Sequence, residues 1–475
     1  MRLLHCIGFA AALALACGGE PIEPLPADAR DTTGPSLSVL SPRGGIYDED
    51  GDGLVDVRIV LADSGGLVDP AGIRVRSLAG VVDPTGQLTD TVELLNVWAV
   101  TERSESLLVV HETVSHLLPS RVNRIELTVP DSAGNITRDT VQFTLPYAAF
   151  HKTIKTGLTM SWLPAAGLAL CPDDGRLYMT VVRRLVVFDP DSLALLTIIE
   201  PGFGTTAELG YPLCVPEDPL LYVTDYAVQR FDRANEQWVS EISNSYHGHS
   251  IVQSRRDPDL LYVGERNSGR IGIISRAAQM RLGGLLPFSP YDEFVFGLAV
   301  LDGDAKLYAT RVFEEGILVV DPRRDTIPKD NPILDTIRIG GSSWPGYGVA
   351  DAIVLSRDDR WLYAAVLDGD PRGIARIDTQ LDSVVAHLPL TNYVPIDLAL
   401  SPDESRMFVT TQDRFPDVPS QNVLIDVPGW RVLQRFPRPH PPGVTRFDRD
   451  IVFHPTGKTI FVTRDVDLDV YLNRR

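Results

Sequence analysis

One four-residue phrase recurs seven times in the last 300 residues of the chain. Each copy holds a bulky apolar residue, an aromatic residue, and two residues that are mostly small or β-branched. Successive aromatic residues lie 40 to 55 positions apart. A period of this length, built from strand-forming residues, predicts the four-stranded blades of a β-propeller. The copies are Leu177-Tyr178-Met179-Thr180, Leu221-Tyr222-Val223-Thr224, Leu261-Tyr262-Val263-Gly264, Leu307-Tyr308-Ala309-Thr310, Leu362-Tyr363-Ala364-Ala365, Met407-Phe408-Val409-Thr410 and Ile460-Phe461-Val462-Thr463.

The sequence around each copy extends the pattern. In the sixth unit, Ser401-Pro402-Asp403 precedes the phrase and Val423-Leu424-Ile425-Asp426 follows it. This S-P-D, L-Y-V-T, V-x-D order resembles the YVTN family of seven-bladed propellers over residues 147–475. The resemblance implies a seven-bladed ring in which the repeated residues are structural. The seventh unit stops short, so we expect its outer strand to come from near residues 150–159 and to close the ring.

Residues 35–146 lack the phrase and alternate short strand-like runs with turns rich in Gly, Pro and Asp. Period-two alternation over such runs predicts an antiparallel β-sandwich. The segment Asp131-Ser132-Ala133-Gly134-Asn135, followed by another strand-like run, resembles the last hairpin of bacterial immunoglobulin-like domains. That resemblance implies an immunoglobulin-like β-sandwich ahead of the propeller, in a chain that is all-β.

Within this domain, residues 48–56 read Asp-Glu-Asp-Gly-Asp-Gly-Leu-Val-Asp. Alternate carboxylates followed by Gly surround one point with oxygen ligands, as a hard cation requires. The spacing resembles the calcium loops of thrombospondin-type and dockerin-type repeats; it departs from the EF-hand because Ile59 stands where Glu is expected. A solvated acidic turn is the alternative to a calcium site. The implied ligands are the side chains of Asp48, Asp50, Asp52 and Asp56 and the carbonyl of Leu54.

Residues 1–16 have the features of an export signal. Arg2 supplies a positive charge, and the apolar run that follows is too short to span a bilayer as a helix. The run ends in Leu13-Ala14-Leu15-Ala16-Cys17-Gly18, which resembles the lipobox of bacterial lipoproteins, with Ala14 in place of the usual Leu. The resemblance implies lipidation of Cys17. Resemblance to the sorting pattern of Gram-negative lipoproteins, with Gly18 after the Cys, favours the outer membrane. An ordinary secretion signal is the alternative. Residues 17–34, rich in Pro and acids, predict a disordered tether.

The formal net charge of −19 argues against nucleic acid as a partner and against electrostatic docking on anionic lipid. We therefore expect a monomeric protein of the cell envelope, held at the membrane by its lipid. Its partner would be an envelope protein or a glycan. The membrane face on which it lies stays open.

Two of the four cysteines remain after export and lipidation, namely Cys171 and Cys214. Each lies at the end of the first strand of its unit. Neighbouring innermost strands converge near a propeller axis, so a disulfide between the first two blades is sterically possible if the Cα atoms lie within about 7 Å. Two buried free thiols are the alternative.

Propeller sites gather where the innermost strands begin, around the axial funnel. Counting back from the end of each inner strand gives Gly167, Gly210, Ser250, Gly297, Ala352, Asp397 and Asp450. Their predecessors are Ala166, Leu209, His249, Phe296, Asp351, Ile396 and Arg449. The alternative to a binding site there is a water-filled funnel that has no specific ligand. The candidate ligand-binding residues are His247, His249, Asp351, Asp397, Arg449 and Asp450.

The chain carries no G-x-S-x-G, no H-E-x-x-H and no phosphate-cradling Gly-rich loop. We therefore expect a membrane-tethered, non-catalytic binding or scaffold protein that acts through its propeller, with calcium as its one expected cofactor. The alternative is a hydrolase or lyase of the lactonase type, with a metal ion in the axial funnel held by the acids of the last three blades.

Overall fold

The structure is a computed structural model. It describes residues 34–41, 55–62, 72–77, 92–93, 99–103, 107–114, 122–131, 133–144, 147–158, 165–181, 183–201, 209–243, 248–265, 268–286, 295–311, 316–323, 332–339, 350–367, 372–390, 393–413, 421–437 and 450–473. These residues form strands and turns, and they include the short 3₁₀ helix η2 (Asp302–Asp304). The described chain divides into two compact units, with Asp56–Val114 and Arg124–Gln142 in the first and Phe143–Arg475 in the second.

The first unit consists of two four-stranded sheets, with orders β1-β2-β6-β5 and β4-β3-β7-β8. On β2 the buried residues Val57, Ile59 and Leu61 alternate with more exposed ones, as expected for a strand with one face in a core. The predicted turn between β7 and β8 is present, because both the backbone N–H and the side-chain amide of Asn135 donate to the Asp131 carboxylate at 2.8 Å. The strands are β1 (Ser36–Ser41), β2 (Val55–Ala62), β3 (Arg74–Ser77), β4 (Val92–Glu93), β5 (Ala99–Arg103), β6 (Leu107–Val114), β7 (Val122–Pro130) and β8 (Ile136–Thr144).

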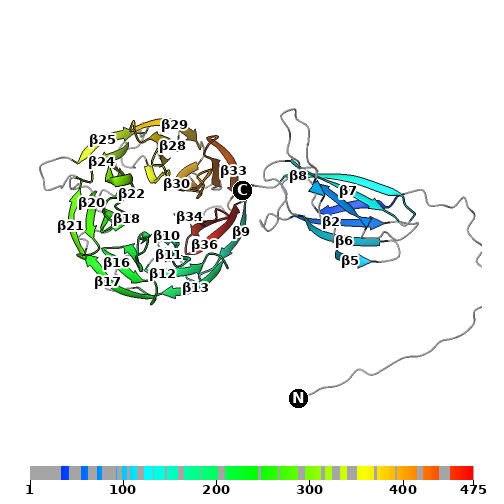
Figure 1. Cartoon of the computed structure of the whole chain (residues 1–475), viewed down its shortest axis with the longest axis horizontal. Helices are drawn as coiled ribbons and strands as arrows, with labels where there is room; N and C mark the ends of the chain where they lie inside the picture. The colour runs from blue at the N-terminus through cyan, green and yellow to red at the C-terminus, as the bar shows by residue number, and fades with distance from the viewer. Residues whose placement is uncertain are drawn as a thin grey trace, which may run out of the picture. The chain divides into compact units, whose positions relative to one another are not determined.

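The second unit is a seven-bladed β-propeller, as predicted: seven four-stranded sheets arranged in a ring (Figure 1). In six blades the strands follow one another in sequence from the axis outward. Blades one to three are β10 (Ala165–Cys171), β11 (Arg176–Val181), β12 (Arg184–Asp189), β13 (Ala194–Ile199); β14 (Pro212–Cys214), β15 (Leu220–Thr224), β16 (Ala227–Asp232), β17 (Gln237–Ser243); β18 (Gly248–Gln253), β19 (Leu260–Glu265), β20 (Ile271–Ser275), β21 (Met280–Leu285). Blades four to six are β22 (Val295–Val300), β23 (Leu307–Arg311), β24 (Gly316–Val320), β25 (Ile333–Arg338); β26 (Ala350–Leu355), β27 (Trp361–Val366), β28 (Gly373–Asp378), β29 (Ser383–Pro389); β30 (Tyr393–Leu400), β31 (Arg406–Asp413), β32 (Gln421–Asp426), β33 (Arg431–Pro437).

The seventh blade joins the two ends of the propeller segment. Its inner strands are β34 (Ile451–Phe453), β35 (Thr459–Arg464) and β36 (Asp467–Asn473), and its outer strand is β9 (Ala148–Ile154). β9 runs antiparallel to β36, with Ile154 opposite Leu468. The prediction that the closing strand comes from upstream is therefore confirmed. The predicted range, residues 150–159, begins and ends a few residues later than β9 does. This pairing leaves no blade with a missing strand.

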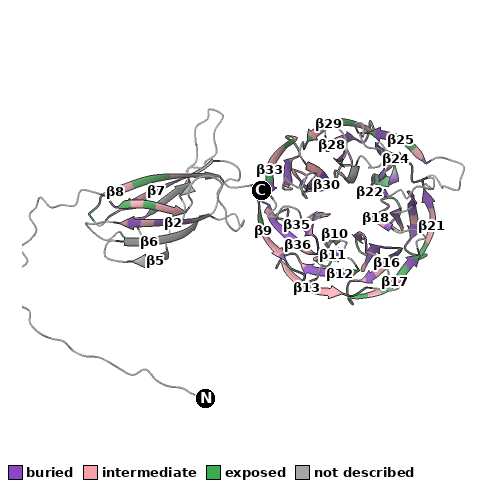
Figure 2. Ribbon diagram, turned by 180° about the vertical axis from the view of Figure 1, so that it is seen from behind, coloured by how far each residue is buried: buried purple, intermediate pink, exposed green. Residues whose placement is uncertain are grey.

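The repeated phrase forms the second strand of every blade, where it is buried between neighbouring sheets. Figure 2 shows the middle strands largely buried and the rim strands β13, β17, β21 and β29 largely intermediate or exposed. Four phrase tyrosines donate their hydroxyl groups to aspartates. Tyr178 donates to Asp174 at 2.8 Å and Tyr222 donates to Asp218 at 2.8 Å. The aromatic position therefore fills the core and also fixes a turn.

In blades one and two, the threonine that ends the phrase links neighbouring blades. Thr180 Oγ1 accepts the N–H of Gly167 at 3.0 Å and donates to the carbonyl of Gly210, in the next blade, at 2.7 Å. Thr224 accepts the N–H of Tyr211 at 2.8 Å and donates to the carbonyl of His249 at 3.1 Å. One hydroxyl thus satisfies two backbone groups near the axis.

Candidate functional site

The inner strands begin at the same end of the propeller axis, because the blades share one strand order. We call the first residues of these strands the hub. In five blades the register of the inner strand shifts there, which inserts one extra residue opposite the second strand. Such β-bulges redirect side chains, and they occur frequently beside binding sites. Each bulge lies at the pair of positions that the sequence count selected in that blade.

In the second blade the count is wrong by one residue. Tyr211 donates its N–H to the side-chain hydroxyl of Thr224, as Gly167 and Asp450 do to the threonines of their own blades. The N–H of Gly210 instead donates to the backbone carbonyl of Thr224. Gly210 is the preceding residue, and a side chain there would collide with Thr224. Sequence counting missed this because Cys214 lies opposite Leu221, whereas Cys171 lies opposite Arg176, one position closer to the turn. Tyr211 therefore joins the hub residues.

Asp397 and Asp450 lie side by side at the hub, where their side chains are hydrogen-bonded to each other. Asp450 also accepts two backbone N–H groups, from Leu168 of blade one and from Ile451 at 2.8 Å. A hydrogen bond between two carboxyl groups requires a proton on one of them. The pair therefore links blades six, seven and one, and it presents both a donor and acceptors.

Burial raises the pKa of Asp450 to about 6. The hydrogen bonds from the N–H of Leu168, from Asp397 and from the N–H of Ile451 act in the opposite direction and limit the rise. A carboxyl that titrates near neutrality, paired with a second carboxyl, is an arrangement often found at functional sites.

Three rings form a continuous row on other blades of the hub. Tyr211 lies 5.1 Å from His249, and His249 lies 5.0 Å from Phe296, measured between ring centroids. The three side chains come from blades two, three and four, and each is partly exposed. We call them the ring row. His249 is a candidate selected from the sequence; Phe296 is among the counted positions but is not one of the selected candidates.

The remaining predicted hub residues are only partly within the described chain. His247 and Arg449 lie outside the described residues. Asp351 belongs to β26, but its side chain is not described. The structure thus brings Asp397 and Asp450 together and places His249 in the ring row.

The other predicted sites fall mostly outside the described residues, namely residues 1–16, Cys17, the tether and the acidic loop from Asp48 to Leu54. Asp56 lies in β2, but its side chain is not described. Within the described ranges, no group of three or more His, Cys, Asp or Glu side chains has the geometry of a metal site.

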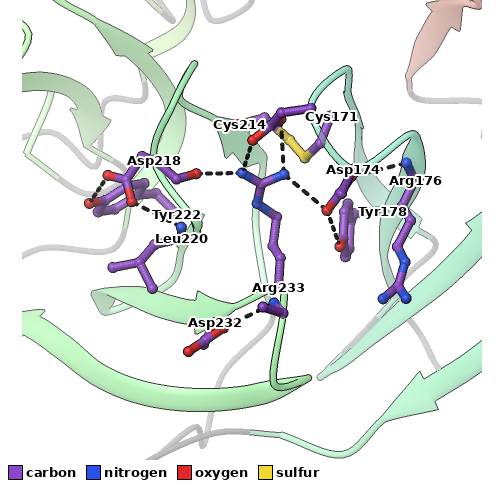
Figure 3. Close-up of polar contacts among 12 residues, drawn as sticks. Cys171, Asp174, Arg176, Tyr178, Cys214, Asp218, Leu220, Tyr222, Asp232 and Arg233 are labelled. Atoms are coloured by element: carbon purple, nitrogen blue, oxygen red, sulfur yellow. Dashed lines mark hydrogen bonds and ion pairs between the residues drawn. A yellow bond between two sulfur atoms is a disulfide. The ribbon is translucent and has the colours of Figure 1, made fainter.

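Cys171 and Cys214 form a disulfide between β10 and β14, with their Cα atoms 5.5 Å apart. Beside it, the buried guanidinium of Arg233 in blade two contacts Asp174 of blade one at 2.9 Å (Figure 3). It also contacts Asp173 of blade one at 3.0 Å. The same guanidinium donates to the backbone carbonyl of Asp218. Blades one and two are therefore joined by a covalent bond and by a buried ion pair.

The chain matches no protein-family model and no curated protein in sequence.

None of the helices within the described ranges has the length and apolar character of a membrane span.

Proposed function

We propose that the chain is an exported, lipid-anchored binding protein whose propeller hub holds a saccharide unit of a glycan. The observation that carries the proposal is the presence of a carboxyl pair and a row of aromatic rings at one end of the inner strands. Sugars offer hydroxyl groups to carboxylates and C–H faces to aromatic rings. Sites for small polar ligands generally combine aromatic walls with a few placed polar groups.

Two further features support this proposal. The lipobox-like segment before Cys17 supports anchoring by acyl chains, each buried CH₂ contributing roughly 0.8 kcal/mol. The two sheets of the first unit and the Asp131 turn support an immunoglobulin-like sandwich, which would serve as a spacer between the lipid and the propeller. The acidic loop would add a weak calcium site to that spacer.

The test is retention of the mature chain on immobilised envelope glycans. Asp397→Asn removes a hub carboxyl and Tyr211→Ala removes a hub ring, so each variant should weaken binding at least tenfold, about 1.4 kcal/mol. Asp335→Asn, an exposed acid on the rim strand β25, is the matched control and should bind as the wild type does. Equal retention of all four proteins, or no retention on any glycan, would refute the proposal.

A second candidate is a hydrolase or lyase that uses the same hub. The raised pKa of Asp450 and its bond to Asp397 favour it, because a general acid works best with a pKa near the operating pH. This reading predicts turnover of a lactone and loss of turnover in the Asp397→Asn, Asp450→Asn double variant. Assays of lactone hydrolysis and of metal content on both proteins decide it: unchanged turnover in the double variant would dismiss the hub as its active site.

A further inference from the structure

A groove of about 380 Å³ opens at the other end of the inner strands, between blades three, four and five. Its walls are the last residues of β18, β22 and β26, whereas the hub is formed by the first. On β18, His249 belongs to the hub and Gln253 lines the groove. These two residues are four positions apart, so the two sites are separated by about 13 Å along the strand. The groove is thus separate from the hub, and its volume lies within the usual range for ligand pockets.

The walls of the groove are mainly aliphatic. They include Val252, Ile353 and Leu355, which are partly exposed, and Leu298, which is buried. The polar lining comes from the turns that follow the strands. This arrangement suits a molecule with an apolar body and one polar end.

The charged lining consists of Arg255, Arg357 and Asp359, which sum to a net charge of +1 in a chain of net charge −19. Arg255 is neutralised, because its guanidinium is ion-paired with Asp359 and lies 3.9 Å from a carboxylate oxygen of Asp302. The guanidinium of Arg357 donates only to an uncharged group within the described chain, the carbonyl of Pro402, at 2.9 Å. Arg357 is exposed, and the Glu404 carboxylate beside it accepts the backbone N–H of Arg357, not its guanidinium.

We infer that this groove binds an amphiphilic anion, specifically an aliphatic carboxylate whose head contacts Arg357 and whose chain lies on the aliphatic walls. A charge-assisted bond from a guanidinium to a carboxylate is among the stronger hydrogen bonds in proteins, and the fork of Arg can make two of them. Burial of each CH₂ of the chain adds to affinity. The inference is independent of the function proposed for the hub.

The experiment is calorimetric titration of the full mature chain with octanoate, with octanol and octyltrimethylammonium as neutral and cationic probes of the same chain length. Octanoate alone should bind well. Arg357→Gln should weaken octanoate binding at least tenfold, and Arg357→Lys, which restores the charge, should recover part of it. Arg338→Gln, an exposed arginine on β25, is the matched control and should change nothing.

Failure to bind octanoate would overturn the inference, as would equal binding in Arg357→Gln or equal affinity for octanol. Asp397→Asn, a hub variant, should bind octanoate as the wild type does. Loss of glycan retention without loss of octanoate binding, or the reverse, separates failure at one site from failure at the other.

Discussion

Thr180 illustrates how one atom of the repeated phrase stabilises the ring. The residue is fully buried, and its hydroxyl bridges Gly167 and Gly210 in adjacent blades. Thr410 occupies the same place in blade six and is also fully buried, but its hydroxyl has no hydrogen-bond partner within the described chain. The phrase therefore predicts the residue at this position, but it does not predict what each copy contributes.

Thr180→Val should lower the free energy of unfolding by about 1–3 kcal/mol, because a buried N–H and a buried carbonyl each lose their partner. Thr410→Val replaces a hydroxyl that has no partner, so it should be neutral or slightly stabilising. Urea unfolding of the two variants and of the wild type checks this. Equal losses in both variants would contradict the bridging role of Thr180.

The Asp450 carboxyl predicts a pH dependence of stability with a definite sign. Its pKa is about 6 in the folded chain and 3.8 ordinarily, so the folded state binds the proton more tightly. Tighter proton binding by Asp450 in the folded state stabilises the fold. This stabilisation is complete below about pH 4 and is lost as the pH rises through 6. The Asp450→Asn variant lacks this pH-dependent contribution. The free energy of unfolding of the variant, relative to that of the wild type, should therefore rise between pH 4 and pH 8, by up to about 3 kcal/mol.

Urea midpoints measured at several pH values on the wild type, Asp450→Asn and Asp335→Asn check that sign. The Asp335→Asn control should follow the wild type across the range, because the Asp335 side chain is exposed. Parallel profiles for Asp450→Asn and the wild type would show that Asp450 has no raised pKa.

At the scale of strands, the bulges decide what the hub displays. The sequence predicts where inner strands begin, because the turn and the phrase mark each blade. It does not predict the register of each inner strand, and Gly210 was counted in place of Tyr211 because Cys214 and Cys171 lie at different register positions. The closing strand β9 was predictable, because blade seven ends before a fourth strand.

The disulfide between β10 and β14 gives a prediction at this scale. Its cysteines are 43 residues apart in sequence, so removing it releases a sizeable loop in the unfolded chain. The Cys171→Ser, Cys214→Ser double variant should lose about 2–4 kcal/mol of stability in guanidinium unfolding. A reductant should lower the midpoint of the wild type and leave the double variant unchanged. A wild-type midpoint insensitive to complete reduction would contradict this.

For the whole molecule, periodicity makes the ring predictable, since each blade repeats the same local pattern of strands and turns. The hub contacts are not predictable in this way. The Asp397–Asp450 bond and the ring row join residues 38 to 53 positions apart, and only closure of the ring sets their distances. The groove near Arg357 was not foreseen at all, because its walls are ordinary strand residues from three blades.

The most direct test is a crystal structure of the mature chain with the saccharide that it retains. The account predicts seven blades, a sugar contacting Asp397 and packed on Tyr211, His249 or Phe296, and a direct contact between the Asp397 and Asp450 carboxyls. A sugar bound away from the hub, or a hub in which these two carboxyls are apart, would contradict it.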